Sequence, residues 1–260
     1  MLFTLDQLND ATAVVREAML PTPQYHWPQL SEETGCQVWV KHENHTPTGA
    51  FKVRGGLVYL KELTSRGERP QLITATRGNH GQSIPYAAAR YGVPVTVLVP
   101  EGNSVEKNAA MRAWGASVET FGADFDVARV EAERRAVERG LTLVPSFHPA
   151  LVRGVATYAL ELFQAAPDLD VVYVPVGMGS GICGVITVRD LLGLSTEVVG
   201  VVSTHAPAMA LSVAAGRIVE TNSANTFADG VACRVPMPAA FDVIRQGAAR
   251  IVQVSEDEVA

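Results

Sequence analysis

Short apolar segments alternate with helical segments along most of the 260-residue chain, and the connections between them are short. Because parallel neighbouring strands need a crossover, usually a helix, this order predicts an α/β fold with mostly parallel sheets and right-handed connections. The expected strands are 37–41, 72–75, 95–99, 118–121, 141–144, 171–174, 198–202 and 251–254. The expected helices include 105–114, 126–138, 152–164, 182–192 and 238–246.

Composition narrows the class of protein. Apolar residues make up 47% of the chain and charged residues 18%, which suffices for one large or two modest domains. A net charge of −6 argues against nucleic acid as a general partner. No run approaches the roughly 20 apolar residues of a membrane helix, and Thr4 and Gln7 predict a capped first helix where a signal peptide would begin. Together with the scattered Cys36, Cys183 and Cys233, these features predict a cytoplasmic protein without membrane partners.

A lysine between an aromatic residue and a glycine pair follows the first expected strand. Lys52 lies in the segment 47–56, between Phe51 and the glycines that follow Arg54. Chemistry at an amine requires its neutral form, which burial or a nearby cation such as Arg54 or Lys41 favours. Most lysines are solvated surface charges, so this motif alone leaves both interpretations open.

A polar cluster follows the expected strand 72–75. Arg77, Asn79, His80 and Gln82 gather where that strand gives way to a helix. A tight turn capped by Asn79 would account for the accompanying glycines. It would not account for the polar side chains, and ligands of open parallel sheets bind at the carboxyl ends of strands.

A glycine-rich loop follows the expected strand 171–174 and leads into a helix. The loop spans 177–184 and carries a hydroxyl at Ser180. Backbone N–H groups and the positive end of the helix dipole make such a loop a phosphate site. The spacing matches neither the P-loop nor the dinucleotide fingerprint, and glycines also serve close packing.

In this order the three motifs resemble those of the fold type II pyridoxal-phosphate enzymes, closest to the threonine dehydratase and serine racemase family. The resemblance runs from about residue 20 to the last residue and includes 41–44, 121–126 and 227–232. It implies two lobes of the kind found in the tryptophan synthase β subunit. A large cofactor-binding domain would comprise 1–70 and 149–260, and a small domain would comprise 71–148. It also implies pyridoxal 5′-phosphate as cofactor, a small amino acid as substrate, and a homodimer.

The resemblance assigns roles to individual residues. Lys52 would be catalytic, bonding to the cofactor aldehyde and later carrying protons. Phe51 would pack beside the pyridine ring, Asn79 would bond its phenolic oxygen, and the glycine-rich loop would hold the phosphate. The cofactor residues are thus Phe51, Lys52, Asn79, Gly177, Met178, Gly179, Ser180, Gly181 and Gly230. The substrate residues are Thr76, Arg77, Gly78, Asn79 and His80.

Several positions depart from the family pattern. Arg77 stands where racemases carry a second proton donor, and an arginine effectively never deprotonates, so elimination is favoured over racemisation. Arg77 could instead bind a carboxylate, or form an ion pair outside the pocket. Met178 and Ser180 interrupt the usual run of glycines. Val202 and Ala208 occupy the positions of acidic metal ligands in other members, so no metal is expected there.

We therefore expect a pyridoxal-phosphate-dependent ammonia-lyase that converts L-threonine, L-serine or a related hydroxy amino acid to a 2-oxo acid and ammonia. Two alternatives stay open: a dehydratase of 3-hydroxyaspartate or another β-substituted amino acid, and a non-catalytic protein that binds cofactor or amino acid. Family members usually continue past the point where this sequence stops, and the further segment supplies the contact to the pyridine nitrogen. We expect the chain to be a piece of such a protein.

Overall fold

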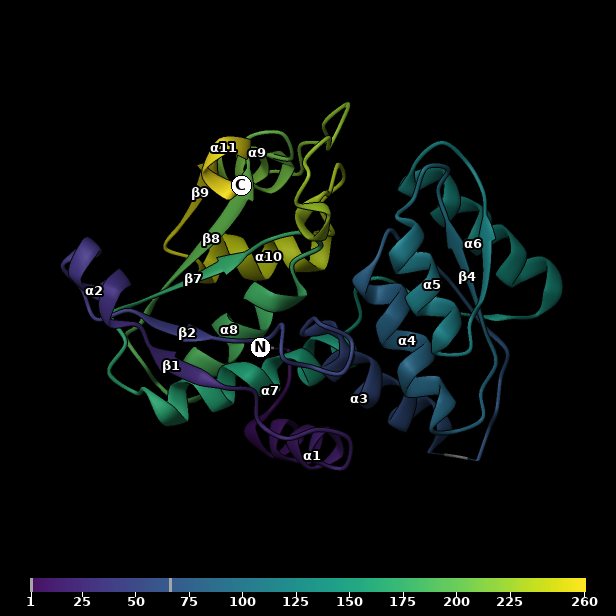
Figure 1. Cartoon of the computed structure of the whole chain (residues 1–260), viewed down its shortest axis with the longest axis horizontal. Helices are drawn as coiled ribbons and strands as arrows, with labels where there is room; N and C mark the ends of the chain where they lie inside the picture. The colour runs from purple at the N-terminus through teal and green to yellow at the C-terminus, as the bar shows by residue number, and fades with distance from the viewer. Residues whose placement is uncertain (1, 66) are drawn as a thin grey trace.

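The computed structural model describes residues 2–65 and 67–260 and shows two lobes side by side (Figure 1). The blue and teal lobe on the right is built from the middle of the chain. The lobe on the left combines the purple N-terminal segment with the green and yellow C-terminal part. Each lobe contains its own parallel sheet.

The right-hand lobe is built on a four-stranded parallel sheet. Its strands in spatial order are β5 (Ser117–Thr120), β4 (Val95–Val99), β3 (Leu72–Ala75) and β6 (Thr142–Leu143). The connecting helices are α4 (Asn79–Ala89), α5 (Val105–Ala113) and α6 (Phe125–Arg139). The central strands β3 and β4 are almost wholly buried, because Ile73 packs against α6 on one face while Leu72 packs against α4 on the other.

The left-hand lobe contains a three-stranded parallel sheet in the order β7 (Val171–Pro175), β8 (Glu197–Ser203) and β9 (Arg250–Val254). Its helices are α7 (Pro149–Ala165), α8 (Ser180–Leu191), α9 (Ala208–Ala215), α10 (Pro238–Gly247) and the short α11 (Glu256–Val259), with a 3₁₀ turn η1 (Asp229–Val231). Helix α8 is buried along most of its length between α7, α10 and the sheet, and forms the centre of the largest core.

The N-terminal segment completes the left-hand lobe and reaches toward the right. It contains α1 (Leu5–Arg16), β1 (Gln24–His26), α2 (Pro28–Thr34), β2 (Trp39–Lys41) and α3 (Lys52–Thr64). The capping box expected at Thr4 and Gln7 is confirmed, since each side chain bonds the other residue's backbone N–H. Helix α3 packs against both α7 and α4, and so connects the two lobes.

The expected α/β fold is confirmed, and all eight expected strands are present with ends shifted by up to two residues. Strand β1 and helices α2, α3 and α9 were not expected. Strand β1 is only three residues long and pairs antiparallel with β2, and α9 is apolar without a helical period. Helix α7 begins three residues before the expected 152, because Pro149 occupies its first turn and His148 Nδ1 accepts a bond from the Ala150 N–H.

Two kinds of feature are absent from the described part of the chain. No helix in residues 2–65 and 67–260 is both long and apolar enough to cross a bilayer. The same residues also contain no group of three or more His, Cys, Asp or Glu side chains arranged to hold a metal ion.

A buried ionic network fastens α3 to its surroundings. Arg54 is fully buried and donates to both oxygens of Glu43 at 2.8 and 2.9 Å. It also donates to both oxygens of Glu161 on α7 at 2.7 and 3.0 Å. Lys41 and Arg16 complete the shell of Glu161, at 2.6 and 2.5 Å. Burial alone would raise the pKa of Glu161, but its bonds to these three cations lower it to about 2.

Replacing Arg54 tests how much this network stabilises the fold. Arg54→Met should lower the free energy of unfolding by about 3–5 kcal/mol, because it leaves buried carboxylates short of a partner. The matched control is Arg134→Met, which removes ion pairs on the solvent-exposed side of α6 and should change the stability far less. Urea unfolding with an unchanged slope measures both. Equal small shifts for the two variants would contradict a structural role for the network.

Candidate active site

Lys52 is the first residue of α3 and follows Phe51, the N-cap of the helix. Its Nζ lies 5.5 Å from the centroid of the Phe51 ring. Burial lowers the pKa of Lys52 to about 8, since the ammonium loses its water on entering the protein. A helix N-terminus also disfavours a positive charge. The amine is therefore neutral at a far lower pH than that of an exposed lysine.

Close helix packing fixes the backbone that carries Lys52. A Cβ on Gly55 would come within 2.7 Å of the Leu151 carbonyl oxygen, and one on Gly154 within 2.3 Å of that of Arg54. Only glycines allow α3 and α7 to cross at this distance. On the other side of α3, the Ser83 hydroxyl of α4 donates to the Lys52 carbonyl at 2.6 Å. The backbone of Lys52 is thus held by contacts from both lobes.

The N-terminus of α4 opens beside Lys52. Its N-cap is Gly78, whose N–H donates to Thr76 Oγ1 at 3.0 Å. The sequence offered Asn79 as the N-cap of this helix, but Asn79 is instead the first helical residue. The N–H groups of the first helical turn have no intrahelical acceptors, and the helix dipole adds a positive potential. This turn can therefore bind an anion such as a carboxylate.

His80 contributes only its backbone to that turn. Its ring Nε2 lies 3.1 Å from Thr74 Oγ1, inside the right-hand lobe. Burial and the neighbouring Lys52 charge lower the pKa of His80 to about 3. The ring is neutral at physiological pH, so it offers no positive charge to an anionic ligand.

The N-terminus of α8 forms a second anion site. Gly179 adopts φ +94°, a left-handed conformation that favours glycine, and directs the chain into the buried Ser180. A Cβ on Gly177 would lie 2.6 Å from the Gly230 carbonyl oxygen, and one on Gly181 would lie 3.4 Å from Phe51 Cζ. These glycines let the chain pass close to η1 and Phe51 as it enters α8, and the N–H groups of a helix N-terminus suit a phosphate group.

The residues around Lys52 line one cavity between these two turns. Phe125, Ser146 and Ala232 contribute to its wall although none was a predicted site residue, and Asp229, from the segment 227–232 that carries part of the resemblance, lines it as well. Ser146 follows β6, so the rule that ligands bind at the carboxyl ends of strands could have found it. The predicted site residues that line the cavity are Lys52, Thr76, Arg77, Gly78, Asn79, His80, Gly177, Met178 and Gly230. Phe51, Gly179, Ser180 and Gly181 lie outside the lining.

Ion pairs join the two lobes across the site. Lys107, at the start of α5, pairs with Asp229 of η1. Arg234 donates to Asp126 at the start of α6, with 2.8 Å between Nη2 and Oδ2. No sequence pattern indicated Lys107 as a site residue, because it lies 29 positions from Gly78, against which its side chain packs. Both pairs hold the lobes close together over the cavity.

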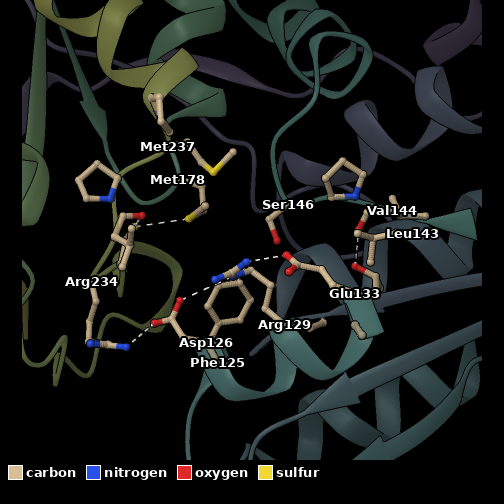
Figure 2. Close-up of a pocket in the computed structure, with 18 residues that line it drawn as sticks. Phe125, Asp126, Arg129, Glu133, Leu143, Val144, Ser146, Met178, Arg234 and Met237 are labelled. Atoms are coloured by element: carbon tan, nitrogen blue, oxygen red, sulfur yellow. Dashed lines mark hydrogen bonds and ion pairs between the residues drawn. The ribbon is translucent and has the colours of Figure 1, made fainter. Parts of the chain in front are cut away.

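A second cavity of about 250 Å³ adjoins the first and shares Phe125, Ser146 and Met178 with it. Figure 2 shows Asp126 between the guanidinium groups of Arg129 and Arg234 on its lower side. Cys233 lies on the same wall, with its Sγ 3.4 Å from the Met178 sulfur. Burial raises the pKa of the Cys233 thiol to about 11, so it remains protonated.

Residues 15–260 match the sequence family described as pyridoxal-phosphate dependent enzyme. The chain belongs to this family. It is 34% identical to the L-threonine ammonia-lyase of Geobacter sulfurreducens over 97% of its own length and 63% of the relative's. It is 31% identical to the enzyme of the same name from Thermotoga maritima, over 100% and 65%. The chain therefore spans somewhat less than two thirds of these relatives.

Solved structures agree in fold. The processed form of threonine deaminase isoform 2 from Solanum lycopersicum superposes with a TM-score of 0.88 at 27% identity, covering 99% of this chain and 77% of that one. An aspartate racemase dependent on pyridoxal 5′-phosphate superposes with a TM-score of 0.92 at 26% identity, over 98% and 80%. The expected fold type II architecture is confirmed. The cradle at α8 and the buried lysine suit the family's cofactor.

The lowered pKa of Lys52 predicts how its reactivity depends on pH. Attachment of pyridoxal phosphate to Lys52 requires the neutral amine, so its rate should rise with pH to a plateau with a midpoint near 8. Borohydride trapping followed by mass spectrometry of the Lys52 peptide measures this rate. Nα-acetyl-lysine is the control and should show a midpoint about two units higher. A midpoint near 10 for Lys52 would contradict its burial.

Proposed function

We propose that this chain catalyses pyridoxal-phosphate-dependent dehydration of a β-hydroxy amino acid such as L-threonine or L-serine, giving a 2-oxo acid and ammonia. The observation that carries this proposal is the buried Lys52, whose pKa is lowered, in a cavity lined by the N-terminus of α4 and by the loop that leads into α8. Relatives called L-threonine ammonia-lyase, at 31% and 34% identity, support the same reaction.

Each part of the site has a separate task in this reaction. The first turn of α8 binds the cofactor phosphate, and the first turn of α4 binds the substrate carboxylate. Bound pyridoxal phosphate supplies the electron sink that acidifies the substrate Cα–H bond. Lys52 removes that proton at Nζ, which is possible because burial favours its neutral form. Lys52 returns this proton to the β-hydroxyl, which leaves as water, and a water molecule then hydrolyses the released enamine to the 2-oxo acid and ammonia.

The residues near Gly78 favour elimination over racemisation. Racemisation needs a second acid on the opposite face of Cα. Arg77 does not release a proton, and the neutral His80 ring is bonded to Thr74. Lys52 is therefore the proton carrier in the proposal, and a single carrier suffices for elimination.

We also propose that 71–148 acts as a small domain that closes on the remainder. The pairs Lys107–Asp229 and Arg234–Asp126 support this proposal, because both cross the gap between the lobes. Closure would exclude water from the reacting amine. Following the family resemblance, the working form is a cytoplasmic homodimer, and the exposed Trp27 offers apolar surface suited to association.

Turnover by matched lysine variants tests the proposed lyase. With pyridoxal phosphate present, the chain should form 2-oxo acid and ammonia from at least one hydroxy amino acid. Lys52→Ala should lower kcat by at least about 1,000-fold, because it removes the proton carrier. Lys61→Ala, an exposed lysine of the same helix, is the control and should retain activity. Dehydratase coupling to lactate dehydrogenase and ammonia release measure the two products.

Two results would overturn this proposal. Turnover retained in Lys52→Ala would remove the assigned proton carrier. Cofactor bound at Lys52 with no 2-oxo acid from any hydroxy amino acid would instead support a binding protein of the same fold.

A further inference from the structure

The cavity around Lys52 has an excess of positive side-chain charge, which the uncharged side chains of threonine and serine would leave without a partner. The lining contains two cationic side chains, Lys52 and Arg77, and one carboxylate, Asp229. Asp229 is already paired with Lys107. Within the described residues, Arg77 has neither an ion-pair partner nor a hydrogen-bond acceptor for its guanidinium. The cavity therefore carries an uncompensated positive charge.

The other groups of the reaction already have partners. In the proposed lyase the cofactor phosphate is assigned to the start of α8, and the first turn of α4 offers backbone N–H groups to one carboxylate. Lys52 must be neutral for its chemistry and cannot serve as a permanent anion site. Arg77 is therefore the one positive charge of the cavity lining that neither the cofactor phosphate nor the substrate α-carboxylate neutralises.

The position of Arg77 suits recognition of a second acidic group. Arg77 lies at the carboxyl end of β3, directly precedes Gly78, the N-cap of α4, and lines the cavity together with Lys52. Lys107 packs over Gly78, but its charge is taken up by Asp229, so it does not compensate or replace the charge of Arg77. A guanidinium binds a carboxylate through two parallel N–H···O bonds, which a hydroxyl or methyl side chain cannot form.

We infer that the site is built for dicarboxylic β-hydroxy amino acids, with Arg77 binding the side-chain carboxylate. This inference rests on the proposed lyase and narrows its substrate class. The simplest such substrate is 3-hydroxyaspartate. Its Cα–H and Cβ–OH bonds break with loss of water, and water then hydrolyses the released enamine to a 2-oxo dicarboxylic acid and ammonia. No oxidant or reductant is needed.

Binding of two isosteric ligands tests the inference without relying on turnover. L-Aspartate and L-asparagine differ only in a carboxylate and an amide, so their relative affinities report recognition of the side-chain charge. Calorimetry of the chain loaded with pyridoxal phosphate should show L-aspartate bound about 10- to 100-fold more tightly. Arg77→Ser should abolish this preference. Arg77→Lys should restore part of it, because lysine keeps the positive charge but cannot form the two parallel N–H···O bonds of a guanidinium.

The control variant is Arg112→Ser, which removes another exposed arginine of the same lobe that does not line the cavity. It should keep the preference for L-aspartate. In turnover assays, the ratio of kcat/KM for 3-hydroxyaspartate to that for L-threonine should exceed one and should fall by about 10- to 100-fold in Arg77→Ser.

The outcomes separate this inference from the lyase proposal. Equal affinities for L-aspartate and L-asparagine, or a preference unchanged in Arg77→Ser, would overturn the role of Arg77 even if L-threonine is dehydrated. The chain could instead prefer L-aspartate in a way that depends on Arg77 but turn over no hydroxy amino acid. That result would support binding of a side-chain carboxylate by Arg77 and would overturn the lyase proposal.

Discussion

The ionic network centred on Arg54 is the interaction on which the site depends. Its two carboxylates come from the segment after β2 and from α7, so one guanidinium fastens three parts of the chain together. Arg54 is two residues from Lys52, so the network holds in place the part of α3 that carries Lys52. An ion pair buried this deeply is costly to break, and its geometry specifies position as much as it adds stability.

The pKa of Lys52 is lowered because of how the two lobes meet. Helix α3 packs on α7 in one lobe and on α4 in the other, and its first residue lies where both lobes reach the cavity. Two helix N-termini near the site supply positive potential for anions from backbone groups. The same arrangement removes water from Lys52 and lowers its pKa. Anion binding and amine activation thus arise from one packing arrangement.

The strands and the three motifs could be predicted from the sequence because each depends on local pattern. The buried strand 72–75 and the glycines before α8 can each be recognised from a few consecutive residues. Contacts between segments that are distant in the sequence could not be predicted in this way. Lys107 reaches Asp229 across 122 positions, and the hairpin strand β1 is too short to show a period. Arg77 was recognised as a departure from the family pattern, but only the structure places it on the cavity wall with Lys52.

The central claim is that Lys52, held between two helix N-termini, is the attachment point of pyridoxal phosphate. The most direct test is the visible absorption spectrum of the purified chain titrated with pyridoxal phosphate, alone and as Gly177→Ala. The account predicts a saturable lysine-bound cofactor band and weaker binding in Gly177→Ala, whose new Cβ would lie 2.6 Å from the Gly230 carbonyl oxygen and disturb the phosphate cradle. No saturable band, or equal affinity in both proteins, would contradict it.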